Sequence, residues 1–258
     1  IATVWDMQHE THPNFTEVSA YGRNLYRKTV NNSFIRRASE IIVGTKTGKS
    51  EVTKYKKFNK NFILLPHPVS KIFLKKKKKT KKKKKKYFFY PANFWQHKNH
   101  LNLIKGFKIF LKNNKNYNLI LSGAKENNYS SVISLIKQLN ISNKIKIEGH
   151  VSLNKLISLY DNCFGVIYAS FSGPENLPPM EALARKKILL NSIYPGAKEQ
   201  LKNFPIYFNP KSPNDIAKAM TKSLMKKSLI ENKKIDKYLK LKDSKLYIKN
   251  LIKKLINV

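Results

Sequence analysis

A carboxylate that follows a buried strand is the first candidate for chemistry in this sequence. Phe164 to Ser170 (FGVIYAS) is a short apolar run of strand length, and the residues from Met180 onward have the composition of a helix. The segment between them, Gly173 to Ala182 (GPENLPPMEA), is predicted to be a strand-to-helix loop with Glu181 at the helix start. Open α/β sheets bind ligands at such loops, beyond the carboxyl ends of their strands.

A lysine stands at a second loop of the same kind. Phe94 to His100 (FWQHKNH) follows the apolar strand YFFY and opens a helix. A helix N-terminus offers free N–H groups and about half a positive charge, so an ammonium group beside it makes an anion site. Lys98 is therefore predicted to bind a negatively charged group such as a phosphate. Without the surrounding loop it would be one surface lysine among many.

Glycines at two further strand ends are weaker candidates. Gly123 ends the strand YNLILSG, and Gly149-His150-Val151 ends the strand KIKIEG. Both positions lie at carboxyl edges of the predicted sheet, where a base or a phosphate would bind. Lone glycines are more often ordinary turn residues, so the spacing by itself does not assign them a function.

Together these segments resemble the donor site of family 4 glycosyltransferases with the GT-B fold. The 173–182 loop is similar to a variant of the family motif that reads G-P-E-N-L-P-P-L-E-A, and residues 90–100 (YPANFWQHKNH) are similar to Y-P-x-N-F-W-x-H-K-N-H. Trp5 to His9 (WDMQH) resembles the H-D-L-Q-H segment that faces the sugar across the cleft. The resemblance covers essentially the whole chain.

The resemblance implies roles for individual residues. Lys98 would hold the donor diphosphate, Glu181 the nucleotide ribose, and His9 would lie near the transferred group, so these three are the catalytic candidates. Asn93 stands where the family usually has an arginine on the phosphates. Positions that line the nucleotide pocket in similar enzymes are occupied here by Gly123, His150 and Val151.

One position departs from the family pattern in a way that concerns the sugar. Gly173 stands eight residues before Glu181, where the family has a glutamate that commonly contacts the transferred sugar. Two alternatives remain open from the sequence. Either Glu175 substitutes from a shifted loop, or the backbone amides of Asn176 and Leu177 do more of the work.

The implied reaction moves a hexose, mannose-like or glucose-like, from a nucleoside diphosphate sugar to a saccharide or lipid-linked acceptor. The resemblance also implies retention at the anomeric carbon, no metal and no cofactor besides the donor. Catalysis would rest on Lys98 and helix N-termini that stabilise the departing diphosphate, which is electrostatic preorganisation rather than acid-base chemistry. The expected location is cytoplasmic, with peripheral contact with the inner membrane face as an option.

A large excess of lysine suggests a different class of function. The 258 residues carry a formal net charge of +37, which by itself favours a nucleic-acid or anionic-membrane binding module. Only five of the 52 basic residues are arginine, the side chain that reads phosphates and base edges best, so we expect no specific nucleic-acid partner. The densest run, Lys75 to Lys86, is interpreted as an exposed connection, with an anchor for anionic lipids as the alternative.

Short apolar strands alternate with helical segments along the chain, which predicts an α/β fold with a parallel, doubly wound sheet. The expected order is the last part of an N-terminal Rossmann-like domain (1–72), a Lys-rich linker (73–86), a complete C-terminal Rossmann-like domain that binds the nucleotide sugar (87–228) and C-terminal helices (229–258). Because the chain opens on what reads as the end of a strand, we interpret it as an N-terminally truncated member. A catalytically inactive fragment that binds sugar nucleotides is the remaining alternative.

Overall fold

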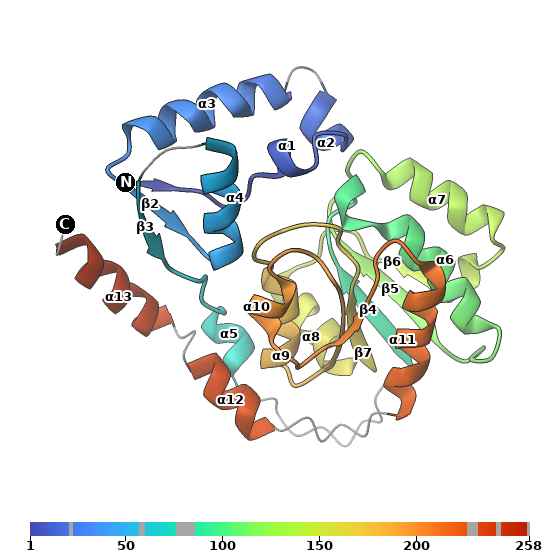
Figure 1. The fold of residues 1–258 in the computed structure, drawn as a ribbon. Coiled ribbons are helices and arrows are strands. Elements are labelled where there is room, and N and C mark those ends of the chain that lie inside the picture. Colours follow the sequence, from blue (N-terminus) through green and yellow to red (C-terminus); the bar gives the residue numbers. More distant parts are fainter. Residues whose placement is uncertain (21–22, 57–59, 76–85, 226–231, 241–243, 257–258) are drawn as a thin grey trace.

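The computed structural model contains two parallel β-sheets that lie next to each other (Figure 1). It describes residues 1–258 apart from 21–22, 57–59, 76–85, 226–231, 241–243 and 257–258. The strand orders are β1-β2-β3 in the smaller sheet and β6-β5-β4-β7-β8-β9 in the larger one. We call the parts of the chain around them the β1–β3 unit (residues 1–65) and the β4–β9 unit (residues 87–225).

The β1–β3 unit is a three-stranded parallel sheet with helices between its strands. Its strands are β1 (Ala2–Thr3), β2 (Glu40–Val43) and β3 (Asn61–Leu64). Its helices are α1 (Gln8–Thr11), α2 (Thr16–Ser19), α3 (Arg23–Arg37) and α4 (Lys46–Lys56). A small core joins the sheet to α3 and α4 through Met7, Ile35, Ile41, Val43 and Val52.

The β4–β9 unit alternates strand and helix throughout. Its strands are β4 (Tyr87–Pro91), β5 (Asn118–Ser122), β6 (Ile145–Ile147), β7 (Gly165–Tyr168), β8 (Ile188–Ser192) and β9 (Ile206–Phe208). Its longer helices are α6 (His100–Leu111), α7 (Tyr129–Gln138), α8 (Leu153–Asn162), α9 (Leu177–Ala184), α10 (Ala197–Leu201) and α11 (Pro213–Met225). Short η2 (Gln96–Lys98) and η3 (Ser142–Lys144) turns precede α6 and β6. The helix α5 (Lys71–Leu74) comes before this unit, and α12 (Asn232–Lys240) and α13 (Ser244–Ile256) come after it.

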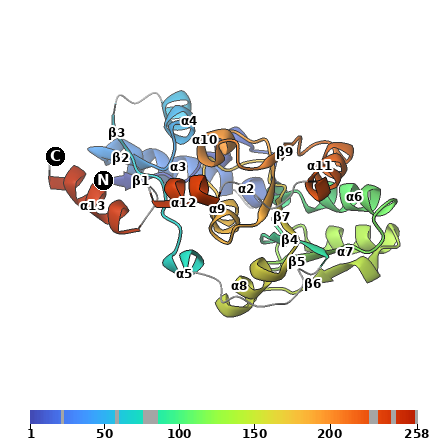
Figure 2. The same cartoon turned by 90° about the horizontal axis from the view of Figure 1, so that it is seen from below.

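Both faces of the larger sheet are buried, as the apolar composition of its strands requires. Side chains alternate along a strand, so Phe88 and Tyr90 of β4 face the core formed with α6, α7 and α11, whereas Tyr87 and Phe89 face the core formed with α8, α9 and α12. From α12 the chain runs back towards the β1–β3 unit, and both termini lie on that side of the molecule (Figures 1 and 2). No helix among the described residues is long and apolar enough to cross a membrane.

The strand order reverses between β4 and β7, and this reversal positions the site. The chain builds β4, β5 and β6 in one direction, then returns to place β7 on the other side of β4, with Phe88 paired to Gly165 and Phe89 to Val166. The loops that leave the carboxyl ends of two such strands diverge and leave a crevice. The loop after β4 ends at Lys98, and the loop after β7 leads into α9.

Glu17 ties the β1–β3 unit to this rim. Its Oε1 accepts hydrogen bonds from the backbone N–H of His97 at 3.0 Å and from His97 Nδ1 at 2.6 Å, and its Oε2 accepts one from Asn127 Nδ2 at 2.8 Å. Burial alone would raise the pKa of Glu17, but these hydrogen bonds outweigh it and lower the pKa to about 2. The Glu17 carboxylate is therefore ionised, and it holds the loop that carries Lys98.

Glu199 makes the reverse connection from the β4–β9 unit. Its carboxylate accepts hydrogen bonds from the backbone N–H groups of Lys46 at 2.6 Å and Thr47 at 3.0 Å, at the start of α4. The first N–H groups of a helix have no partner within the helix, and a carboxylate there also meets the positive end of the helix dipole. Glu199 thus caps a helix of the other unit.

The observed architecture confirms the predicted α/β fold with a parallel, doubly wound sheet. The two sheets fall within the ranges predicted for the two Rossmann-like parts, while the exact boundaries at 72, 86 and 228 stay predictions. Most of the lysine run from Lys75 to Lys86 lies outside the described residues.

Candidate active site

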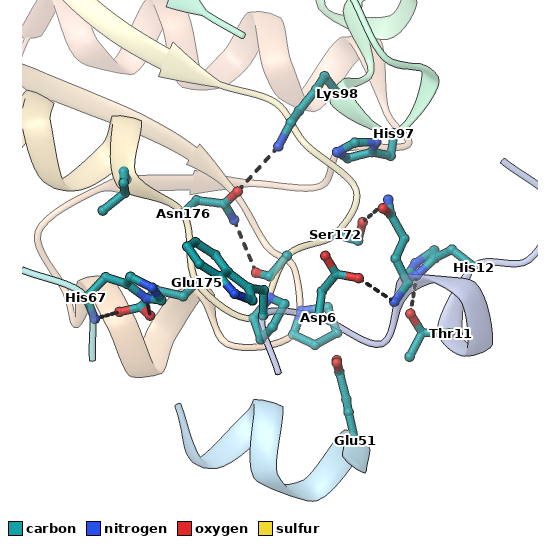
Figure 3. Close-up of a pocket in the computed structure, with 16 residues that line it drawn as sticks. Asp6, Thr11, His12, Glu51, His67, His97, Lys98, Ser172, Glu175 and Asn176 are labelled. Carbon is teal, nitrogen blue, oxygen red and sulfur yellow. Dashed lines mark hydrogen bonds and ion pairs between the residues drawn. The ribbon is translucent and has the colours of Figure 1, made fainter. Parts of the chain in front are cut away.

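A pocket of about 220 Å³ lies between the two units at the carboxyl ends of β4 and β7 (Figure 3). The β4–β9 unit contributes one wall, which includes Lys98 and the loop 172–177. The β1–β3 unit contributes the facing wall, with residues from the segment after β1 and one from α4. The chain between the units adds His67. Both predicted loops therefore meet at one site.

Lys98 is the cationic group of this pocket. Its Nζ donates hydrogen bonds to the Tyr168 hydroxyl at 2.8 Å and to Asn176 Oδ1 at 3.4 Å, and Figure 3 shows it pointing from the upper wall towards Asn176. Desolvation lowers the pKa of Lys98 to about 8, against the attraction of Asp6 and Glu17. Lys98 is thus mostly protonated at neutral pH and fixed in place, as an anion site requires.

The loop 173–176 is held rigidly at the N-terminus of α9. Asn176 Oδ1 also accepts a hydrogen bond from the Tyr168 hydroxyl at 2.6 Å, and the Asn176 backbone exchanges two hydrogen bonds with the Gln200 side chain, at 3.0 and 2.8 Å. Gly173 has a φ of +126°, which is strained for any residue with a Cβ atom. Leu177 is 41% exposed and lines the pocket. The backbone N–H of Asn176 is taken by Gln200, and Pro178 and Pro179 carry none, so Leu177 is the residue in the first turn of α9 whose N–H could serve a ligand next to Lys98.

Glu181 lies one turn further along α9 than the sequence suggested. The helix begins at Leu177, because Pro178 occupies its first turn, where a missing N–H costs nothing. Glu181 Oε2 accepts a hydrogen bond from the Tyr160 hydroxyl at 2.7 Å, and burial raises the pKa of Glu181. Glu181 does not line the pocket of Figure 3.

Glu175 lines the pocket but is already paired. Its Oε1 accepts a hydrogen bond from the backbone N–H of His67 at 2.9 Å, and its Oε2 contacts His67 Nδ1 at 2.6 Å. The His67 ring in turn lies 4.7 Å from the Trp5 ring. Glu175 therefore joins the β4–β9 unit to the segment between the units, and much of its hydrogen-bonding capacity is occupied.

Two carboxylates of the pocket come from the β1–β3 unit, and sequence reasoning did not select them. Asp6 lies within the WDMQH segment, and Glu51 lies on α4. Figure 3 shows both side chains pointing into the pocket from below. Burial raises the pKa of Glu51 to about 7, with a further contribution from the charge of Asp6. The WDMQH motif could have indicated Asp6, whereas no local signal marks Glu51.

His9 does not reach this pocket. It is 1% exposed, its Nε2 lies 3.4 Å from Asn31 Nδ2 of α3, and it lines a separate hollow beside β1 and α3. Consecutive helical residues point about 100° apart, so Gln8 faces the pocket while His9 faces α3. Gln8 Nε2 donates a hydrogen bond to Ser172 Oγ at 3.1 Å. Within the WDMQH segment, Trp5, Asp6 and Gln8 line the pocket, whereas His9 does not.

The other predicted nucleotide-binding positions do not line the pocket. Gly123 approaches the loop after β4 so closely that a Cβ atom would lie 2.3 Å from the Ala92 carbonyl oxygen. Asn93 Oδ1 accepts a hydrogen bond from the Ala124 backbone N–H at 2.9 Å. His150 and Val151 follow β6 and, like Asn93 and Gly123, do not line the pocket. Asn93 therefore braces two loops, and Gly123 is required by their close packing.

The chain belongs to a known enzyme family. Residues 71–242 match the family model of glycosyl transferases group 1. A curated relative is the O-antigen chain mannosyltransferase RfbU of Salmonella typhimurium, 28% identical over 116 residues, which cover 45% of this chain and 32% of that protein. The match thus spans about a third of the relative's length.

Solved structures share the fold at low sequence identity. The structure of Anabaena HepE in complex with UDP and glucose has a TM-score of 0.81 at 13% identity and covers 100% of this chain and 71% of its own. A glycosyltransferase from Rickettsia africae has a TM-score of 0.74 at 17% identity, over 88% of this chain and 65% of its own. A sucrose-phosphate synthase from Thermosynechococcus elongatus has a TM-score of 0.76 at 14% identity, over 94% and 65%. These likenesses establish the fold, which is that of GT-B glycosyltransferases.

Proposed function

We propose that this chain binds a nucleoside diphosphate sugar and belongs to a retaining, metal-independent family 4 glycosyltransferase. Such an enzyme transfers a hexose to a saccharide or lipid-linked acceptor. One observation carries the proposal: a buried ammonium group, Lys98, and the N-terminus of α9 converge on one pocket at the strand-order reversal. Anionic phosphates bind at this combination of a cation and a helix N-terminus.

Lys98 and α9 would act on the leaving group. As the bond to the sugar breaks, negative charge grows on the diphosphate, and preorganised cations and N–H groups stabilise it without rearranging. Tyr168 and Asn176 hold Lys98 Nζ before the substrate arrives. The lowered pKa of Lys98 reflects its desolvated position, where its charge acts at short range through little water.

Glu181 is proposed to bind the ribose, beyond the diphosphate. A carboxylate accepts hydrogen bonds from two neighbouring hydroxyls, and the contact from Tyr160 orients it along the rim. The base would then lie towards Gly123, His150 and Val151. These residues follow β5 and β6 at the carboxyl edge of the same parallel sheet. The donor would thus extend along the rim from the pocket towards β6.

For the donor sugar and the partners, the proposal rests on the related proteins and on the net charge rather than on the geometry of the pocket. The mannosyltransferase relative favours a mannose-like hexose, whereas the UDP complex among the structural neighbours favours a glucose-like donor. We further propose that the chain works in the cytoplasm in peripheral contact with an anionic membrane surface. The net charge of +37 supports this, because each lysine near such a surface contributes about 1 kcal/mol.

Isothermal titration with UDP, GDP and ADP tests nucleotide binding directly. We expect one of the three to bind with a 1:1 stoichiometry and Lys98→Met to weaken it. Absence of heat with all three nucleotides would contradict the proposal. Transfer of a radiolabelled hexose from the matching donor then separates an enzyme from a fragment that only binds sugar nucleotides.

Two finer points need their own measurements. We expect transfer to continue at full rate in EDTA, and loss of activity on chelation would contradict metal independence. Proton NMR of the product reports the anomeric configuration, and inversion would exclude a retaining mechanism.

A further inference from the structure

The two walls of the pocket carry opposite charge. Lys98 stands in the wall of the β4–β9 unit, and the carboxylates of Asp6 and Glu51 enter from the facing wall. Asp6 is close enough to Lys98 to raise its pKa and close enough to Glu51 to contribute to the raised pKa of that group. A ligand that fits both walls has an anionic end and an end that donates hydrogen bonds, as the hydroxyl groups of a sugar do.

Asp6 is held in place and keeps hydrogen-bonding capacity. Its Oδ1 accepts a hydrogen bond from the Gln8 backbone N–H at 2.9 Å, and the Gln8 side chain reaches across to Ser172. A carboxylate can accept about four hydrogen bonds, so Asp6 can accept several more from a ligand. The Gln8 to Ser172 contact brings this segment against the loop that precedes α9.

Glu51 approaches the same space from a different element. It lies on α4, the helix whose N-terminus Glu199 caps from the β4–β9 unit. That cap fixes the helix relative to the pocket wall that carries Lys98. Figure 3 shows the Glu51 carboxylate directed at Asp6 and the pocket interior.

The remaining polar side chains of the pocket are already engaged. Glu175 is paired with His67, Asn176 bonds both Tyr168 and Lys98, and Ser172 is bonded by Gln8. Gly173, between them, has no side chain to offer. Asp6 and Glu51 are therefore the charged acceptors that a group of hydroxyls in this pocket would meet, beside the uncharged amide oxygen of Gln8.

We propose that Asp6 and Glu51 bind hydroxyl groups of the transferred sugar and determine which hexose the enzyme accepts. This inference rests on the proposed function, because the diphosphate must lie on Lys98 for the sugar to reach the opposite wall. A site built to accept hydrogen bonds from particular hydroxyls rejects a sugar that lacks or misplaces them, since its buried acceptors stay unpaired. The two carboxylates thus do what Glu175, the acidic residue of the loop after β7, cannot do while it is paired with His67.

The test compares a nucleoside diphosphate with its sugar conjugate. Dissociation constants of UDP and UDP-glucose, and of GDP and GDP-mannose, are measured by titration calorimetry for the wild-type chain, Asp6→Asn, Glu51→Gln and the double variant. Glu10→Gln is the matched control, because Glu10 lies on α1 next to the pocket segment and pairs with Lys28 outside it.

We expect the free nucleotide to bind all variants equally. The preferred conjugate should bind each single variant roughly tenfold to a hundredfold more weakly than the wild type, the range for loss of a hydrogen bond to a charged group. The Glu10→Gln control should behave as the wild type. Circular dichroism confirms that each variant is folded.

The failures of the two proposals are distinguishable. If the nucleotide binds and the conjugate loses no affinity in either variant, the carboxylates do not bind the sugar and this inference is overturned alone. If neither nucleotide nor conjugate binds the folded wild type, the proposed function fails and this inference fails with it. If free nucleotide and conjugate weaken together, Asp6 and Glu51 act through the position of Lys98, and the inference is again overturned.

Discussion

The two walls of the pocket are supported in different ways. In the β4–β9 wall, Lys98 is held by Tyr168 and Asn176, and Asn176 is held by Gln200, all within one unit. In the β1–β3 wall, Asp6 accepts a hydrogen bond from the Gln8 backbone N–H of its own unit. Two contacts across the interface add to this support, because Gln8 bonds Ser172 and Glu199 caps α4. The half of the pocket that we propose for the diphosphate is thus preorganised within one unit, whereas the half that we propose for the sugar also depends on contacts between the two units.

The two walls are therefore expected to control two different properties, the affinity for the nucleoside diphosphate and the choice of sugar. A preorganised cation binds any ligand with a diphosphate, whatever sugar it carries. Under our proposal the acidic wall determines which sugar is accepted, and contacts from the other unit help to position the residues that form this wall. A change in the first wall should therefore weaken every donor, and a change at the interface should act mainly on fold stability and sugar selection.

The largest expected effect is the loss of Lys98. Lys98→Met keeps the apolar stem and removes the charge, so we expect nucleotide affinity to fall by roughly tenfold to a hundredfold, with or without a sugar attached. Lys105→Met, an exposed position on α6, is the control. Unchanged calorimetric affinity in Lys98→Met would show that the β4–β9 wall does not bind the phosphates.

The next effect concerns Glu17, which joins the units. Glu17→Gln should lower the free energy of unfolding by about 1–3 kcal/mol at pH 7, because it replaces charge-assisted hydrogen bonds to His97. The folded-state pKa of about 2 lies below the ordinary value of 4.5, so this contribution is complete above pH 4.5 and is lost as the pH falls through about 2. Urea unfolding at pH 7 and pH 3 measures it, with Glu126→Gln as the control. Equal stability of wild type and Glu17→Gln at pH 7 would refute the role.

A smaller effect is expected at Glu199. Glu199→Ala removes the cap that α4 receives from the other unit, which should cost about 1 kcal/mol of stability. Faster amide hydrogen exchange in the first turn of α4 would locate the loss there, and the exposed neighbour Lys198→Ala should not change it. If exchange in α4 stays as in the wild type, the interface does not position this helix.

The smallest effect is a pH dependence of sugar recognition. The pKa of Glu51 is about 7, so ionisation between pH 6 and pH 8 should increase the ratio of conjugate to nucleotide affinity by about threefold to tenfold. The other titratable groups that line the pocket are Asp6, His12, His67, His97, Lys98 and Glu175. Burial lowers the pKa values of His12, His97 and Lys98. The terminal phosphate of the free nucleotide, with a second pKa of about 6, also titrates near this range and contributes to the ratio. The pH dependence should be smaller in Glu51→Gln, where the ionisation of the free nucleotide remains; an equal pH dependence in wild type and Glu51→Gln would contradict the role of Glu51.

The strands of the β4–β9 unit were predicted well because the apolar runs and turn residues that indicate them lie within a few positions of each other in the sequence. The short apolar runs YFFY and FGVIYAS predicted β4 and β7, and the observed bounds differ by a few residues at most. The start of α9 was predicted too late: its prolines read as part of a loop, although proline fits the first turn of a helix.

The residues of the site also fall into two groups, those that local sequence predicted and those that only the contact between the units brings to the pocket. Lys98 and Asn176 were predicted to share a site, and they meet, because parallel strands bring all their following loops to one edge. Glu51 and His67 were not predicted, because they reach the pocket only through the contact between the units, and Glu175 meets His67 across 108 positions of sequence. His9 was predicted to face the pocket, and its place on α1 turns it towards α3 instead.

The sequence by itself determined which segments become strands and helices and which loops carry a lysine or an amide to the rim of the sheet. Those features follow from periodicity and from the parallel arrangement, both of which are read over short stretches. Only the tertiary structure decided that a second, acidic wall closes the pocket and that carboxylates from each unit fasten it to the other. Such contacts depend on how two separately folded surfaces fit together, and no spacing along the chain encodes that fit.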